Sequence, residues 1–443
     1  MAQALIGFCG DDFTGSSENL AQLHRQGLRT RLFLRPLPFD KLKEAARGLH
    51  AIGFAGATRA LSVEKIGEEL SPVFALLRRF APRFLQYKIC STFDSSPTIG
   101  SYGAAMASAR EAFGDCDFAF LPAVPDFGRY TAFGQQFARF GADIARLDRH
   151  PSMASHPKTP MDEADLRLHL ARQTSLPFAN IFLPLLHDGA AARKAMLDAF
   201  DHGRGVIFDS VDNDDLARVA ALLWEASIDR RIFALAAQGL AHSLGRLAAA
   251  EVPADERICV RTQIPSVDRL LILSGSCALQ TGRQIDFVKE QGWATARLDP
   301  RRLDDARERD AVVDFLVAET LESVAAGRPM VIYTARGAVD RVAGEDEVSA
   351  EALGAAFARI ARQVRQKLAL PRIVFAGGDS SSYSVRALGA DALDIGVFDA
   401  QESSHLCKLI SENPVVDGLE VMLKGGQVGT DAYFQYAMTG RRS

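Results

Sequence analysis

Short apolar runs alternate with segments of helical periodicity along nearly the whole chain. Amphipathic stretches such as 62–79, 102–113 and 214–226 separate runs that are typical of buried strands. Such alternation is the pattern of βαβ units, in which a crossover helix brings each strand into parallel pairing. The sequence therefore predicts an α/β fold with mainly parallel sheets. The predicted strands are 4–9, 31–33, 51–54, 84–89, 118–122, 205–208, 232–236, 270–273, 294–298, 329–333, 372–376, 392–398 and 421–423.

The chain becomes polar and proline-containing around residues 251–256, before a new series of strands and helices begins at residue 269. Because 443 residues exceed one compact core, we expect two α/β domains, residues 1–250 and 260–443, with a ligand-binding cleft between them. Residues 147–174 interrupt the alternation with several prolines. An irregular excursion of this length predicts a functional loop or a lid.

Charge and cysteine usage exclude several classes of protein. The net charge is −4 and the basic residues are scattered, so no broad positive surface for nucleic acid is expected. Six cysteines without C-x-x-C spacing favour reduced thiols over a disulfide framework or a zinc site. No apolar stretch approaches the ~20 residues of a membrane helix, and the first residues read as a strand, not as a signal peptide. We expect a cytoplasmic protein without a nucleic-acid or membrane partner; homo-oligomerisation is left open.

Two adjacent acids, Asp11 and Asp12, follow the first predicted strand. Ligands of parallel α/β sheets sit at the carboxyl ends of the strands, so these carboxylates lie where chemistry is usually done. A local alternative is a turn in which Thr14 or Ser16 caps the following helix. Two acids flanked by glycines exceed what a cap requires, and we expect a functional role for at least one of them.

Basic and hydroxyl groups follow two further strands of the first half. Arg59 comes after the strand that ends at residue 54, and Lys88, Ser91 and Thr92 lie at the end of the next one. Together they could bind a small carboxylate, with Arg59 supplying a bidentate fork. The alternative is that the two basic residues are ordinary surface charges.

Small-residue loops follow three strands of the second half. They are 274–277, 375–382 and 423–430, and the last two contain consecutive glycines. Backbone N–H groups exposed in such loops can surround phosphate oxygens, which indicates a nucleotide. Neither glycine loop matches the P-loop or G-x-G-x-x-G pattern, and each taken alone could be a simple turn.

With these residues in view, the chain resembles the four-carbon acid sugar kinases. The D-D-x-T-G, A-T-R and K-x-x-S-T segments of that family are matched around Asp11, Arg59 and Lys88. Its G-S strand end, G-G-[DE]-[ST]-S loop and K-x-G-x-x-G loop are similar to residues 275–276, 377–381 and 424–429. The six matches occur in the family's order over nearly the whole chain.

The resemblance implies an ATP-dependent kinase that phosphorylates a terminal hydroxyl of a small sugar acid, such as threonate, erythronate, 3-oxo-tetronate or 3-oxo-isoapionate. The first domain would bind the acid and the second the nucleotide, with Mg²⁺ bridging ATP oxygens largely through water. The sequence departs from the family's motifs at two places, and the identity of the acid substrate is therefore left open. This chain has Ser382-Tyr383 where the family usually has a glycine, and Asp94-Ser95 where it commonly has arginine and glycine.

The resemblance also implies residue roles. Asp11 or Asp12 would accept the hydroxyl proton, without an assignment between them. The residues expected to bind the acid are Asp11, Arg59, Lys88, Ser91 and Thr92. Those expected to bind the nucleotide are Ser276, Gly377, Gly378, Asp379, Lys424, Gly425, Gly426, Gln427, Val428 and Gly429; no side chain is predicted to ligate a metal directly.

Two other classes remain as alternatives. A sugar-acid dehydrogenase would need a G-x-G-x-x-G fingerprint, which the sequence lacks, and an aldolase-like enzyme would use the two domains differently. A non-catalytic binding or sensor protein of the periplasmic type would usually carry an export signal, which the first residues do not resemble.

Overall fold

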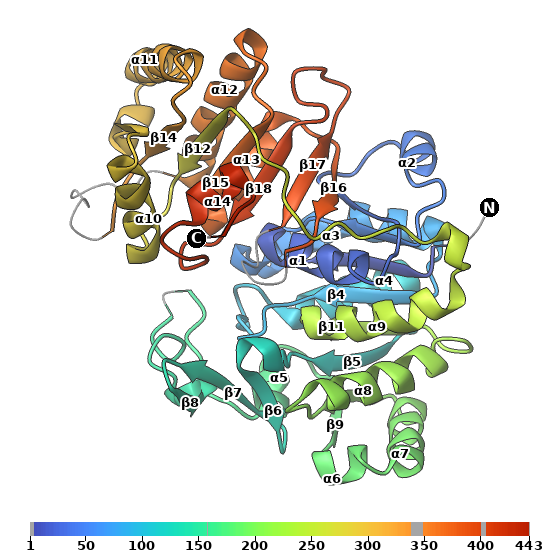
Figure 1. The fold of residues 1–443 in the computed structure, drawn as a ribbon. Coiled ribbons are helices and arrows are strands. Elements are labelled where there is room, and N and C mark those ends of the chain that lie inside the picture. The colour runs from blue at the N-terminus through green and yellow to red at the C-terminus, as the bar shows by residue number, and fades with distance from the viewer. Residues whose placement is uncertain (1–3, 157, 338–348, 400–404, 443) are drawn as a thin grey trace. The chain divides into compact units, whose positions relative to one another are not determined.

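The computed structural model describes residues 4–156, 158–337, 349–399 and 405–442 (Figure 1). The chain divides into two compact units, Met1–Cys259 and Val260–Ser443. Each is a parallel or mainly parallel sheet with helices on its faces, which confirms the predicted α/β class. Among the described residues, no helix has the length and apolar character that crossing a bilayer requires.

The main sheet of the first unit has the strand order β2-β3-β1-β4-β11-β5-β10-β9, and its neighbouring strands are parallel. The chain first moves from β1 to β2, returns through β3, and then continues on the other side of β1 at β4. Loops at the carboxyl ends of β1 and β4 therefore diverge, as at the ligand sites of open α/β sheets. The strands are β1 (Ile6–Gly10), β2 (Thr30–Phe33), β3 (Ala51–Phe54), β4 (Phe84–Lys88), β5 (Asp117–Leu121), β9 (Phe178–Ile181), β10 (Gly205–Phe208) and β11 (Ile232–Ala236).

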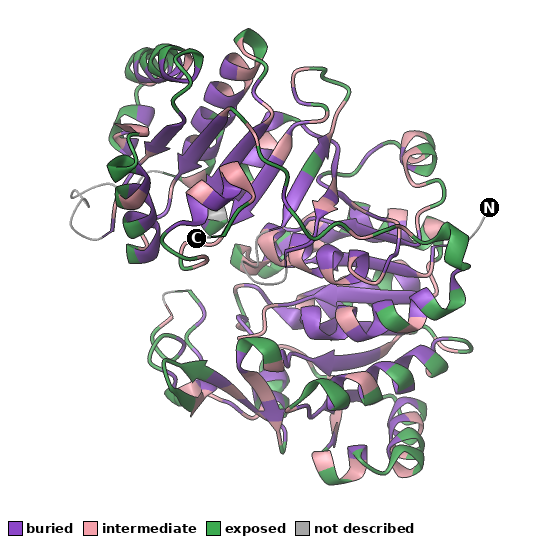
Figure 2. Ribbon diagram, viewed as in Figure 1, coloured by how far each residue is buried: buried purple, intermediate pink, exposed green. Residues whose placement is uncertain are grey.

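Helices cover both faces of this sheet because the crossovers change direction at β1. Helices α1, α8 and α9 pack side by side, and α3 packs against α4 (Figure 1). The strands are buried almost throughout, as the purple ribbons of Figure 2 show. The helices are α1 (Phe13–His24), α2 (Phe39–Ala45), α3 (Val63–Phe80), α4 (Tyr102–Phe113), α5 (Leu166–Ala171), α6 (Leu183–Leu186), α7 (Gly189–Asp201), α8 (Asn213–Ala226) and α9 (Gln238–Glu251).

A small antiparallel sheet, not predicted from the sequence, follows β5. It consists of β6 (Arg129–Ala132), β7 (Gln135–Phe140) and β8 (Asp143–Arg146) in that order. Buried positions in β6 and β7 are separated by accessible ones, and β8 has no buried position, so these strands form no continuous apolar run. The irregular segment 147–174 returns to this sheet, where Gln136 N–H donates to Ala164 O at 3.0 Å.

The sheet of the second unit has the order β13-β14-β12-β15-β18-β17-β16. In this order, the neighbouring strands from β13 to β18 are parallel. Strand β17 runs antiparallel to both of its neighbours, β18 and β16. Strand β17 was not predicted. The strands are β12 (Leu270–Ser274), β13 (Ala294–Arg297), β14 (Met330–Tyr333), β15 (Arg372–Ala376), β16 (Ala392–Val397), β17 (Leu406–Ile410) and β18 (Glu420–Lys424).

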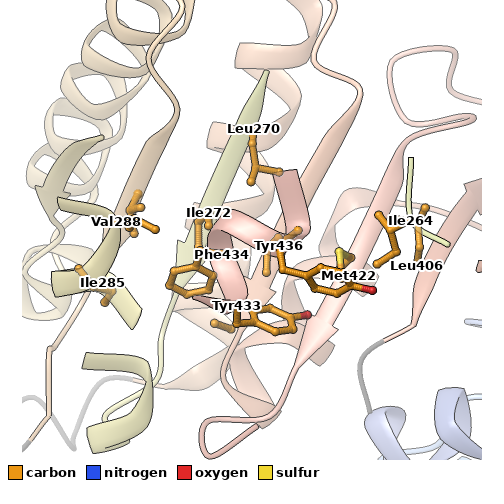
Figure 3. Packing of buried hydrophobic residues seen from close by; sticks show 14 of the residues in the cluster. Ile264, Leu270, Ile272, Ile285, Val288, Leu406, Met422, Tyr433, Phe434 and Tyr436 are labelled. Atoms are coloured by element: carbon orange, nitrogen blue, oxygen red, sulfur yellow. The ribbon is translucent and has the colours of Figure 1, made fainter. Parts of the chain in front are cut away.

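The core of this unit fixes the strands that carry the small-residue loops. Ile272 of β12 and Met422 of β18 pack in one cluster with Ile285 of α10 and with Tyr433 and Phe434 of α14 (Figure 3). Burial of these large side chains contributes roughly 1.5–3 kcal/mol each. The helices are α10 (Leu279–Glu290), α11 (Ala306–Ala325), α12 (Ala350–Lys367), α13 (Gly378–Leu388) and α14 (Tyr433–Thr439).

Candidate active site

Two carboxylates follow the carboxyl end of β1. Asp11 has a side chain that is only 2% exposed, and its Oδ2 accepts a hydrogen bond from the backbone N–H of Cys90 at 3.1 Å. Asp12 is 26% exposed, and its Oδ1 accepts from the N–H of Gly15 at 3.1 Å. Asp12 is thus the N-cap of α1, so the cap expected at Thr14 or Ser16 was wrong. The two acids differ in burial, which the sequence did not reveal.

Arg59 connects these carboxylates. It lies in the turn after β3, which pairs with β1, and its Nε and Nη2 donate to Asp11 at 3.2 and 2.8 Å. The same Nη2 donates to Asp12 Oδ1 at 2.6 Å. The fork that we expected to bind a substrate carboxylate is therefore engaged with the protein's own acids.

The pKa values of Asp11 and Asp12 are shifted in opposite directions. Burial raises the pKa of the Asp11 carboxyl above its ordinary value, although Arg59 opposes the shift. Burial acts in the same direction on Asp12, but the charges of Arg59 and Lys88 together with the hydrogen bond from Gly15 oppose it, and the pKa of Asp12 lies below its ordinary value. Asp12 is therefore an ionised, partly exposed carboxylate at neutral pH.

Lys88, the last residue of β4, approaches the same group. Its side chain is buried, and Nζ donates to the carbonyl of Ile89 at 2.7 Å. A Cβ on Gly15 would lie 2.9 Å from Lys88 Nζ and 2.4 Å from Asp12 Oδ1. The glycine of the D-D-x-T-G segment thus leaves the space in which the ammonium and the carboxylate approach each other.

The loop after β4 holds Ser91 and Thr92. Thr92 Oγ1 donates to Asp94 Oδ1 at 2.7 Å and lies 2.9 Å from Cys90 Sγ. Burial raises the pKa of the Cys90 thiol to about 11. The carbonyl of Ser91 accepts from Gln136 Nε2 of β7 at 2.9 Å, so the small sheet supports this loop. Sequence reasoning missed Gln136, because one glutamine in an alternating segment carries no signal.

In the second unit, the three small-residue loops follow the adjacent strands β12, β15 and β18. Gly275 N–H donates to Ala376 O at 2.9 Å, and Gly377 N–H donates to Lys424 O at 2.8 Å. A Cβ on Gly426 would lie 2.7 Å from Ser276 Oγ. The structure therefore brings these predicted nucleotide residues together.

Lys424, the last residue of β18, holds the loop that follows this strand through hydrogen bonds from its ammonium group. Its Nζ donates to Thr281 Oγ1 and Gly425 O at 3.0 Å each, and to Gly426 O at 3.2 Å. Burial lowers the pKa of Lys424 to about 7. Thr281, on α10, also donates to Gly426 O at 2.8 Å, a role that the sequence did not indicate.

Side chains of α10 fix the rest of the loop after β18. Gln284 Nε2 donates to Val428 O at 3.0 Å, and Gln280 Nε2 donates to Gly429 O at 2.8 Å. Gln427, which precedes Val428, is exposed. Sequence reasoning missed both α10 glutamines, although their spacing of four residues places them on one helix face.

Helix α13 begins at the glycine loop after β15. Its N-cap, Gly377, has φ +116° and provides no side-chain cap for the first turn. Gly378 is exposed, and a Cβ there would meet no described atom within 4 Å. Uncapped N–H groups at a helix N-terminus favour an anion. Asp379 belongs to α13, but its side chain lies outside the described residues.

Comparison with known proteins places these clusters in named domains. Residues 6–244 match the family described as "Sugar-binding N-terminal domain", and residues 271–434 match the "Nucleotide-binding C-terminal domain". The group formed by Asp11, Asp12, Arg59 and Lys88 lies in the first match, and the three small-residue loops lie in the second.

Among curated proteins, the 3-oxo-isoapionate kinase of Paraburkholderia graminis is 35% identical over 99% of this chain and 95% of its own length. The 3-oxo-tetronate kinase of Methylobacterium radiotolerans is 30% identical over 88% of this chain and 89% of its own.

Solved structures share the fold. A protein from Salmonella typhimurium, 22% identical, has a TM-score of 0.80 and covers 99% of both chains. A protein from Haemophilus influenzae, also 22% identical, has a TM-score of 0.73 and covers 97% of this chain and 98% of its own. The domain matches and the curated relatives together show that this chain belongs to the four-carbon acid sugar kinase family.

Proposed function

We propose that this protein transfers the γ-phosphoryl group of ATP to a hydroxyl of an oxo-sugar acid of the 3-oxo-isoapionate type. The 35% identity to a 3-oxo-isoapionate kinase over nearly the whole of both chains supports the substrate class. The observation that carries the chemistry is the ionised Asp12 carboxylate, partly exposed at the end of β1 and flanked by Arg59 and Lys88.

Asp12 is our candidate for the general base. A base needs an accessible, ionised carboxylate within reach of the hydroxyl, and of the two adjacent acids Asp12 is the more exposed and has the lowered pKa. Asp11 then positions Arg59 and the loop after β4 through its hydrogen bonds.

Ser91 and Thr92 are the proposed contacts for the hydroxyls of the acid, because both lie in the loop that Asp11 holds in place. Lys88 adds positive charge beside Asp12. Positioning of this kind is the main contribution a protein makes to phosphoryl transfer, in which little covalent chemistry is required of its side chains.

The nucleotide would bind at the three loops of the second unit. Gly378 offers an N–H group of the uncapped first turn of α13, whereas the N–H of Gly377, the N-cap, already donates to Lys424 O. Ser276 lies beside Gly377 and Gly426. Lys424 Nζ donates to the carbonyls of Gly425 and Gly426 and so fixes the loop after β18. The open space at Gly378 supports a close approach of phosphate to the backbone.

Mg²⁺ fits this arrangement as a companion of the nucleotide. Among the described residues, no group of three His, Cys, Asp or Glu side chains could hold a metal ion. Mg²⁺ commonly binds through phosphate oxygens and water with few protein ligands. When bound, it neutralises the charge that develops on the phosphates.

A coupled assay of ADP release tests the proposal. The panel contains 3-oxo-isoapionate, 3-oxo-tetronate, threonate and erythronate, each with ATP and Mg²⁺. We expect the highest kcat/KM with 3-oxo-isoapionate. ADP release that no acid stimulates, together with thermal stabilisation by NAD, would overturn the kinase assignment.

A further inference from the structure

One face of the small antiparallel sheet points toward the proposed acid site. Thr131 of β6 and Gln136 of β7 are cross-strand partners, both buried, and Thr131 Oγ1 donates to Gln136 Oε1 at 2.6 Å. Gln136 Nε2 in turn donates to the carbonyl of Ser91 at 2.9 Å. This face of the sheet therefore rests on the loop after β4.

Arg129 lies on the same face. Residues two apart in a strand share a face, so Arg129 and Thr131 project together, and the cross-strand partner of Arg129 is the buried Ala138. The carboxylate of Asp94, in the loop after β4, acts on the guanidinium of Arg129 and opposes the lowering of its pKa by burial. Arg129 is thus placed beside the same loop that Asp11 and Gln136 hold.

The guanidinium of Arg129 is incompletely paired. Its Nη1 donates to the carbonyls of Phe127 and Gly128 at 2.9 and 3.3 Å. Its Nε is buried and, among the described residues, has no hydrogen-bond partner. Burial lowers the pKa of this guanidinium, in contrast to Arg59, whose pKa the two aspartates hold well above its ordinary value. A buried donor without an acceptor is costly and requires an explanation.

The carboxylate of an acid substrate would supply the hydrogen-bond acceptor that Arg129 Nε lacks. The site already contains the carboxylates of Asp11, Asp12 and Asp94, which repel another carboxylate. Arg59 is engaged with the first two of them. A second arginine with a free donor offsets this repulsion and binds a carboxylate with defined geometry.

We propose that Arg129 binds the carboxylate of the sugar acid and so selects acids over neutral sugars. This inference rests on the proposed function for the identity of the acid. It assigns a substrate-binding role to the small sheet and leaves Arg59 to position Asp11 and Asp12.

The test compares Arg129→Gln with Arg139→Gln. Arg139 lies on β7 of the same sheet, is exposed, and contacts Tyr130 OH at 3.3 Å, so its replacement is a matched control. Steady-state kinetics give KM for the acid and for ATP, and the corresponding acid amide serves as a neutral analogue. Melting temperatures report the fold, and Arg129→Lys provides a variant that keeps the charge.

We expect Arg129→Gln to raise KM for the acid roughly 10- to 100-fold, as for a lost charge-assisted hydrogen bond, while KM for ATP stays within about twofold. The preference for the acid over its amide should collapse in this variant and partly return in Arg129→Lys. A purely structural role would lower the melting temperature without changing this preference. An unchanged KM for the acid, or a rise in KM for ATP instead, overturns the inference.

Calorimetric binding of the same acids keeps the inference separate from the kinase assignment. If wild type binds an acid without turnover and Arg129→Gln does not, the kinase assignment fails and the inference stands. If wild type is active and Arg129→Gln binds the acid normally, only the inference fails. If wild type binds none of the acids, both are overturned.

Discussion

Arg59 and Asp11 form a two-point ion pair, with Nε to Oδ2 at 3.2 Å and Nη2 to Oδ1 at 2.8 Å. The partners lie 48 residues apart and meet because β3 pairs with β1. Since Asp11 is almost completely buried, the pair fixes the direction of the chain at the end of β1 and with it the position of Asp12. The geometry of the proposed base therefore depends on an arginine from another strand.

Arg59→Lys should destabilise the protein and reduce turnover. One ammonium cannot reproduce the fork on Asp11 and the additional bond to Asp12, and a buried carboxylate that loses a charged donor costs about 1–3 kcal/mol. Denaturant unfolding and kcat measure the two effects.

Arg146→Lys is the matched control for that experiment. Arg146 makes a comparable fork to Asp148, at 2.7 and 2.6 Å, but its side chain is 38% exposed. Exposed pairs contribute about 0–1 kcal/mol, so this variant should unfold nearly as wild type does. If Arg59→Lys weakens only binding of the acid and leaves stability and kcat unchanged, Arg59 binds substrate instead of positioning the aspartates.

Asp12→Asn should reduce kcat by roughly 10²–10⁴-fold with substrate binding largely retained, as for a lost general base. Asp11→Asn should act mainly through loss of the Arg59 pair and lower the melting temperature. Because Arg59 and Lys88 hold the pKa of Asp12 below its ordinary value of 3.8, the acid limb of kcat assigned to Asp12 should lie below pH 3.8. Near-normal turnover in both variants would place the base elsewhere.

The sequence predicted the strand-end groups because polar residues directly after apolar runs mark the ends of parallel strands. It did not predict how these groups pair. The order of the strands decides which loops are neighbours, and nothing local to Arg59 indicates that its partners are Asp11 and Asp12. The difference in burial between the two acids likewise depends on the whole sheet.

The missed elements have a common physical reason. The missed strands are β6 to β9 and β17. They contain exposed or only partly buried positions, so their sequences lack the continuous apolar run of a buried parallel strand. With β6 and β7 missed, Gln136 and Arg129 could not be assigned to the site. The long-range partners Thr281, Gln280 and Gln284 were missed because they hold a distant loop through its backbone carbonyls.

Lys424 should make stability depend on pH in a defined direction. Its pKa is about 7 in the folded protein and ordinarily 10.5, so between these values the unfolded chain binds a proton that the folded chain does not. The free energy of unfolding should therefore rise with pH across this window, by at most about 1.4 kcal/mol per pH unit from this group. Subtracting the curve of Lys424→Met, which has no titrating amine, isolates the effect; parallel curves would contradict the prediction.

Lys424 should also link ATP binding to a proton. A phosphate near Nζ favours the ammonium form, so ATP binding at pH 8 should take up a proton in wild type. Calorimetry in buffers of different ionisation enthalpy measures the uptake. Lys424→Met should show none and should bind ATP more weakly, because the carbonyls of Gly425 and Gly426 lose their donor. Equal uptake in both proteins would assign the proton to another group.

Gly378→Val should weaken ATP binding without disturbing the fold. Gly378 is the first residue of α13, and a Cβ there would meet no described atom within 4 Å, so the added methyl groups would occupy only the space that the proposed phosphates need. Gly426 is a poorer probe, because a Cβ there would lie 2.7 Å from Ser276 Oγ and 2.9 Å from Ala278 Cβ, which mixes fold and ligand effects.

Gly189→Val is the matched control for Gly378→Val. Gly189 is likewise the first residue of a helix, α7 of the other unit, and a Cβ there would also meet no described atom within 4 Å. Both variants should melt near the wild-type temperature without ligand. We expect Gly378→Val alone to raise the Kd for ATP, by roughly tenfold or more, which corresponds to about 1.4 kcal/mol or more of lost contact with the backbone N–H groups. If calorimetry gives the wild-type Kd for a folded Gly378→Val, the phosphates do not approach the N-terminus of α13, and the nucleotide must be held by the loops after β12 and β18 without it.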